Sequence, residues 1–128
     1  MNMKRITQLI IMSICMTSCV TTTDEGLDVL KKLGTQLNQV RALPTGTPTN
    51  LRCPEKLDIF TGIKKDKIYS ELGEPDSSYA PESDADEKWC YFFTSPIPSG
   101  RRGGGFPELT FYFNDKNLVE RATCYYSK

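Results

Sequence analysis

The chain has 128 residues, enough for one small domain. Its 16 basic and 16 acidic residues balance, which argues against a strongly basic nucleic-acid-binding protein, so nucleic acid is not an expected partner. It contains no histidine, and therefore lacks the commonest general base and the commonest metal ligand. No catalytic set of side chains stands out, so we expect no enzyme activity, no metal and no cofactor.

Residues 1–18 have the pattern of an export signal. A basic start is followed by the mostly apolar residues 6–16, a run shorter than the ~20 residues of a membrane span, and small residues come just before Cys19. The pattern is similar to a bacterial lipoprotein signal, in which Cys19 is lipidated and becomes the first mature residue. An ordinary signal peptide cut nearby is the alternative. Valine rather than aspartate at position 20 points to the outer membrane. We therefore expect a protein of the cell outer membrane that faces the periplasm and contacts membrane lipid through the acylated Cys19.

The spacing of apolar residues next predicts an amphipathic helix over roughly residues 27–43. Five residues at intervals of three and four form one stripe: Leu27, Leu30, Leu33, Leu37 and Val40. Gly34 is expected to weaken the middle of this helix by ~1 kcal/mol, and Pro44 stops it. The stripe can pack on the domain that follows or on a partner. Residues 44–50 have the composition of a linker, so residues 19–50 would be a lipidated tether and residues 51–128 the main domain.

Two short helices are expected at the start of the main domain. Pro54 suits the first turn of one of them, in which three residues share a face: Leu57, Phe60 and Ile63. The other contains Ile68 and Leu72, which lie four residues apart and so on the same side. It ends sharply, because Gly73 fits the position just past a helix end and Pro75 cannot continue a helix. Helices this short are stable only when they pack on another element.

Three strands are predicted after residues 76–87, whose polar and acidic composition indicates a loop. The strands cover residues 88–93, 109–113 and 118 to about 126, with a turn at 114–117. We therefore predict an α+β fold in which two short helices pack on the aromatic face of a three-stranded antiparallel meander. The residues expected to form its core are Ile68, Leu72, Gly73, Pro75, Trp89, Tyr91, Phe93, Leu109, Phe111 and Phe113.

The order of these elements resembles the SmpA/OmlA (BamE-like) family of outer-membrane lipoproteins over roughly residues 55–122. Four pieces carry the resemblance: Gly62-Ile63 opening a helix, Leu72-Gly73-Glu74-Pro75-Asp76 closing it, the strand Trp89-Cys90-Tyr91-Phe92-Phe93, and Leu109-Thr110-Phe111-Tyr112-Phe113-Asn114. One departure is Lys64, which stands where the family has a Ser or Thr helix cap and cannot accept the amide hydrogen bonds.

The resemblance implies a BamE-like two-layer fold and a non-catalytic accessory role in outer-membrane protein assembly or envelope integrity. The partners it implies are outer-membrane assembly proteins or another envelope protein. The same two-layer fold occurs in β-lactamase inhibitor proteins. The alternative is therefore a periplasmic inhibitor or immunity lipoprotein that blocks a toxin or hydrolase.

Three cysteines remain in the mature chain: Cys53, Cys90 and Cys124. An exported protein meets an oxidising compartment, so two of the three are expected to pair. The first and third strands of a meander lie about 9.6 Å apart, whereas a disulfide needs Cα atoms within roughly 7 Å. Cys53 is therefore the favoured member of the bond, with Cys124 or Cys90 as its partner.

Four residues are candidates for partner binding: Arg101, Arg102, Phe92 and Tyr112. The arginines belong to the segment SGRRGGGFP, which lacks the Gly-Lys-Ser/Thr ending of a phosphate-binding loop and predicts a hairpin loop. They can bind lipid headgroups or an acidic partner, or simply be solvated. The two aromatic residues lie on the predicted strands, where the rim and the far side of the sheet are left for binding.

Overall fold

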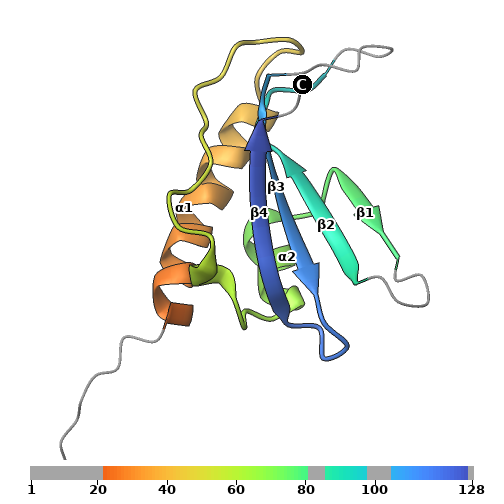
Figure 1. Cartoon of the computed structure of the whole chain (residues 1–128). Helices are drawn as coiled ribbons and strands as arrows, with labels where there is room; N and C mark the ends of the chain where they lie inside the picture. Colours follow the sequence, from red (N-terminus) through yellow and green to blue (C-terminus); the bar gives the residue numbers. More distant parts are fainter. Residues whose placement is uncertain (1–21, 81–85, 98–104, 127–128) are drawn as a thin grey trace, which may run out of the picture.

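The computed structural model describes residues 22–80, 86–97 and 105–126, and these form an α+β fold in two layers (Figure 1). The elements in chain order are helix α1 (Thr22–Arg41), the 3-10 helix η1 (Asp58–Phe60), helix α2 (Lys65–Leu72), and strands β1 (Ser77–Tyr79), β2 (Glu87–Phe92), β3 (Pro107–Phe113) and β4 (Val119–Tyr126). The strands form one antiparallel sheet in the order β1-β2-β3-β4, with the helices on one of its faces. The predicted signal peptide (1–18) and Cys19 lie outside the described residues.

Helix α1 packs on its own domain. Four residues of its apolar stripe are buried in the same core as the sheet: Leu30, Leu33, Leu37 and Val40. The helix begins and ends earlier than the predicted range 27–43, at Thr22 and Arg41. Of the two alternatives for the stripe, the structure therefore shows the intramolecular one. Within the described part of the chain, no helix combines the length and apolar character that crossing a membrane requires.

Two glycines allow α1 to approach its neighbours closely. A Cβ atom added at Gly34 would lie 2.2 Å from the carbonyl oxygen of Glu71 in α2. One added at Gly26 would lie 2.1 Å from the carbonyl oxygen of Ile59 in η1. A side chain at either position would therefore push α1 away from α2 or η1. Glycine at position 34 lowers the helix propensity of α1, and the closer packing of the apolar stripe offsets this loss of stability.

Helix α2 begins and ends as its sequence indicates. Lys64 precedes it and makes no side-chain capping hydrogen bond, while Asp66 places a negative charge in its first turn. At the other end Gly73 has a φ of 76°, a positive value that favours glycine, and its N–H donates to the carbonyl of Tyr69 at 2.8 Å. The buried side of the helix carries Ile68 and Leu72.

The other predicted short helix, opening at Pro54, is wrong. Only the three residues of η1 are helical in that region. Ile59 and Phe60, next to each other in this short 3-10 helix, are both buried. The expected face of Leu57, Phe60 and Ile63 is thus replaced by a tight turn that inserts two neighbouring side chains into the core.

The sheet has four strands instead of the predicted three. Strand β1 lies within residues 76–87, which were expected to form a loop, and its Ser78 pairs with Trp89 of β2. This strand is short and polar at the edge of the sheet, so it shows none of the apolar alternation that indicates a half-buried strand. The other three strands lie close to their predicted positions.

The aromatic face of the sheet forms the core beneath the helices. The fully buried rings and side chains include most of the expected set: Ile68, Leu72, Tyr91, Phe93, Leu109, Phe111 and Phe113. Phe111 meets the ring of Phe60 edge-on at 5.4 Å, and Phe113 meets that of Trp89 at 5.0 Å. Trp89 is partly buried against this cluster. The packing of these rings orders the short α2 and η1.

Candidate binding site

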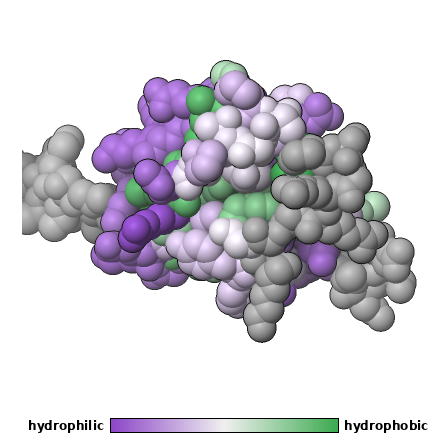
Figure 2. All heavy atoms as spheres, turned by 90° about the horizontal axis from the view of Figure 1, so that it is seen from above, coloured by the Kyte–Doolittle hydropathy of each residue, from purple (hydrophilic) through white to green (hydrophobic). Residues whose placement is uncertain are grey.

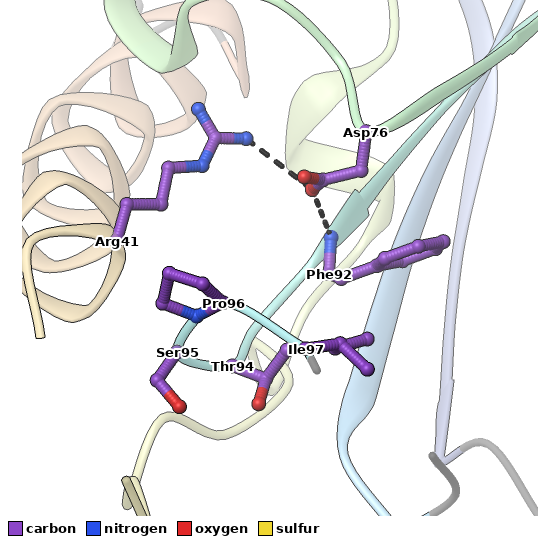
Figure 3. Close-up of a pocket in the computed structure, with 7 residues that line it drawn as sticks. All are labelled: Arg41, Asp76, Phe92, Thr94, Ser95, Pro96 and Ile97. Atoms are coloured by element: carbon purple, nitrogen blue, oxygen red, sulfur yellow. Dashed lines mark hydrogen bonds and ion pairs between the residues drawn. The ribbon is translucent and has the colours of Figure 1, made fainter. Parts of the chain in front are cut away.

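An open hollow of about 280 Å³ lies at the end of the molecule where α1 finishes. Figure 3 shows the residues that line it: Arg41, Asp76, Phe92, Thr94, Ser95, Pro96 and Ile97. They come from the end of α1, the turn before β1, and the end of β2 with the segment that follows it. Figure 2 looks onto this end of the molecule and shows an apolar area among polar groups.

Arg41 joins the end of α1 to residues 72–76 at one wall of the hollow. Its guanidinium donates to the carbonyl oxygens of Leu72 and Glu74, each at 3.3 Å. It also forms an ion pair with Asp76, in which Nη2 and Oδ2 are 3.3 Å apart. The planar group with its several donors suits this task better than a lysine ammonium would. Arg41 thereby satisfies a carbonyl at the C-terminal end of α2 and ties it to the last turn of α1.

Asp76 links the same wall to the sheet. Its Oδ2 accepts a hydrogen bond of 2.7 Å from the backbone N–H of Phe92, in addition to the contact with Arg41 (Figure 3). The side chains of Asp76 and Arg41 remain 31% and 29% exposed. The pair is therefore fixed in position while part of each charged group stays accessible to a partner.

Tyr91 supports the ion pair from the core side. Its hydroxyl donates to the carbonyl oxygen of Gly73 at 2.8 Å, and the guanidinium of Arg41 lies 5.9 Å from the centre of its ring. Burial raises the pKa of Tyr91 above its ordinary value, and the positive charge of Arg41 only partly opposes this. The hydroxyl therefore keeps its proton, and its role as a donor, to a higher pH than an exposed tyrosine would.

The opposite wall is held by residues that follow α1. Ser95 is buried and donates to the carbonyl of Thr47 at 2.7 Å, and the N–H of Gly46 donates to the carbonyl of Pro96 at 3.0 Å. The predicted linker 44–50 thus supports the segment 94–97. Both walls of the hollow are positioned by hydrogen bonds before any partner arrives.

The four predicted binding residues are not all at this site. Phe92 lines the hollow, and its ring packs against Phe106 with the centroids 5.6 Å apart. Tyr112 does not line it and instead lies under the guanidinium of Arg121, 3.6 Å from the ring centre. Arg101 and Arg102 lie outside the described residues.

Arg41 and Asp76 were missed by the sequence reasoning. A basic residue in the last turn of a helix and an aspartate after the Gly73–Pro75 stop were the available signals. Neither signal indicated that residues 35 positions apart would meet. Their contact depends on how α1 packs across α2.

Cys53 and Cys124 are disulfide-bonded in the structure, with their Cα atoms 5.7 Å apart. Of the two partners left open for Cys53, the structure therefore pairs Cys124. Cys90 is free, and its sulfur accepts a hydrogen bond of 3.3 Å from the hydroxyl of Thr110. The disulfide between Cys53 and Cys124 ties the segment before η1 to the edge strand β4.

The groups that line the hollow are partly apolar and partly charged. The hollow combines apolar groups from Phe92, Pro96 and Ile97 with one guanidinium and one carboxylate. Over residues 22–80, 86–97 and 105–126, no three His, Cys, Asp or Glu side chains are grouped so that they could hold a metal ion. No protein-family model matches the chain, and neither does any curated protein or solved structure.

Proposed function

We propose that this chain is a non-catalytic outer-membrane lipoprotein with a BamE-like domain, anchored through Cys19 and facing the periplasm. It binds another envelope protein and serves as an accessory to outer-membrane protein assembly or envelope integrity. The observation that carries the proposal is the hollow beside Arg41, where apolar walls adjoin a partly exposed ion pair. Such a combination of an apolar centre with a few placed polar groups is typical of sites that recognise a partner.

The rigidity of the hollow supports a role in binding. Arg41, Asp76 and Ser95 each hold a wall through hydrogen bonds to another segment. A surface that is already ordered loses little conformational entropy when a partner docks. An apolar side chain of the partner entering between Phe92 and Ile97 would bury its surface against walls that do not have to rearrange.

Photo-cross-linking in cells tests the proposal. A photoreactive residue at Ile97, a half-buried position in the hollow, should give an adduct with an envelope protein after solubilisation in detergent. The matched control is the same residue at Tyr125, which is 71% exposed on β4. It should give no such adduct.

Genetic complementation provides the second measurement. Deletion of the gene should weaken the outer-membrane barrier, and the variant Tyr125→Asp should restore it whereas Ile97→Asp should not. An intact barrier in the deletion strain, together with a tight one-to-one complex with a toxin or hydrolase, would contradict the assembly role. That result would favour the inhibitor alternative. Metabolic labelling with palmitate tests the anchor separately, because Cys19→Ser should abolish the label.

A further inference from the structure

We propose that the domain stands on the membrane with the hollow directed away from the lipid, so that the hollow receives the water-soluble part of an envelope protein. This inference rests on the proposed lipidation of Cys19 and deepens the proposed function by naming which part of a partner can reach the site. The observations that carry it are the position where α1 begins, the length of α1 and the way it is packed.

The chain between the anchor and the domain is very short. Cys19 and the start of α1 at Thr22 are three residues apart. Three residues span at most about 11 Å even when fully extended. Acyl chains on Cys19 would therefore hold the first turn of α1 close to the headgroups of the membrane.

The hollow lies at the other end of the same helix. α1 has 20 residues and ends at Arg41, which lines the hollow. A helix of that length is roughly 30 Å long. In Figure 1 the helix begins low on the left and rises to the upper end of the molecule. Figure 2 views that upper end.

The helix cannot pivot against the rest of the domain. Leu30 and Leu37 are completely buried, and Gly34 lies so close to α2 that a single added carbon would collide with the backbone of Glu71. Two ends of one rigid element therefore move together. With the first turn of α1 held near the membrane, the tilt of α1 therefore sets how far the hollow lies from the lipid.

The residues of α1 whose side chains the structure describes, 24–41, do not favour a position flat on the membrane. A helix that lies in the interface needs a free apolar face, and the apolar stripe of α1 is buried in the core. Its exposed positions include charges of both signs, such as Asp28, Lys31 and Lys32. The mature chain has 14 basic and 16 acidic residues, so it has no net attraction to an anionic lipid surface.

The distance between the membrane and the hollow decides which part of a partner can bind. Electrostatic effects of the headgroups fade within a Debye length of about 8 Å at physiological salt, so they do not reach Arg41 at the far end of the helix. The membrane-spanning part of a partner cannot reach the hollow either, because the hollow lies at the end of α1 that is far from the membrane. The remaining occupant is a periplasmic segment that presents an apolar side chain to Phe92 and Ile97 and polar groups to the ion pair.

Fluorescence quenching on vesicles tests this orientation in the full lipidated chain. On a Cys90→Ser background, Thr61→Cys places a fluorophore beside η1, which lies against Gly26 near the start of α1, and Ala42→Cys places it beside Arg41. Both positions are exposed. The vesicles contain phosphatidylethanolamine, phosphatidylglycerol and a lipid with a nitroxide quencher on its headgroup.

We expect strong quenching at residue 61 in the acylated chain. At residue 42 we expect no more quenching than the same chain shows without acylation. Equal quenching at both residues, or stronger quenching at 42, would overturn the orientation. Mass spectrometry of the reconstituted protein separates the two proposals. An acylated chain quenched at residue 42 refutes only this inference, whereas a chain recovered from membranes without an acyl group refutes the anchor and both proposals with it.

Mapping the cross-link from Ile97 by peptide mass spectrometry tests the nature of the partner. The attached peptide should belong to a segment of the partner that lies outside the membrane. Adducts with lipid, or with a membrane-spanning segment, would refute the inference even where binding itself is confirmed.

Discussion

Gly34 offers the sharpest test of how the helices pack. Alanine at an exposed position in the middle of a helix is normally about 1 kcal/mol more favourable than glycine. At Gly34 the added carbon would lie 2.2 Å from the carbonyl oxygen of Glu71, which belongs to the backbone and cannot swing away. Packing and intrinsic propensity therefore predict opposite signs for the same substitution.

The packing effect should exceed the gain in propensity. Moving the two atoms to a normal separation requires a shift of about 1 Å between α1 and α2, and overpacking of this kind costs about 3 kcal/mol. Subtracting the gain of about 1 kcal/mol leaves a net loss of roughly 2 kcal/mol in the free energy of unfolding. For a domain of this size that corresponds to a fall of about 10 °C in Tm.

Chemical and thermal unfolding of a soluble form starting at residue 20 measures the effect. The control is Thr35→Ala, a substitution at the adjacent, exposed position of the same helix, which should change stability by less than about 0.5 kcal/mol. If Gly34→Ala were as stable as the parent or more stable, α1 would not cross α2 as closely as the structure shows. α1 would then also be free to move against α2, and its two ends would not hold the hollow at a set place relative to the membrane.

Three further changes test the contacts that hold the domain and its hollow together. Replacing Cys53 and Cys124 together by serine should cost about 4 kcal/mol in guanidinium unfolding, because the bond closes a loop over 71 residues of sequence. Reductant should lower the midpoint of the parent and leave that of the double variant unchanged. Tyr91→Phe removes the hydrogen bond to Gly73 and should cost about 1 kcal/mol at pH 7. Because burial raises the pKa of Tyr91, the unfolded chain ionises first, so the parent should lose stability more steeply than Tyr91→Phe as the pH rises above about 10. Arg41→Lys should lower the free energy of unfolding by about 1 kcal/mol, since an ammonium cannot span two carbonyls and a carboxylate, and an unchanged Tm would contradict that role.

Elements with strong periodic patterns were predictable from the chain. Strands β2, β3 and β4 are rich in aromatic and other strand-favouring residues, and the end of α2 is marked by Gly73 and Pro75. The apolar stripe of α1 was equally clear. Each of these signals is local, because it depends on residues within one element.

Elements that depend on distant contacts were not predictable. Strand β1 has no apolar alternation and exists because its backbone pairs with β2. The region of η1 carries helix-like spacing, yet two consecutive side chains are pulled into the core there. Phe92 was identified as a candidate binding residue, but its neighbours in the hollow come from segments far along the chain.

The sequence by itself determined the kinds of layer and the composition of the core, because hydrophobic periodicity and helix stop signals act over a few residues. It also predicted that Cys53 would take part in a disulfide. Only the tertiary structure decided that the stripe of α1 closes the core of its own domain, that Cys124 is the partner of Cys53, and that Arg41 meets Asp76 beside an open hollow. Those outcomes depend on how closely the elements pack. At Gly34, α1 lies so close to α2 that the one additional carbon atom of an alanine would not fit.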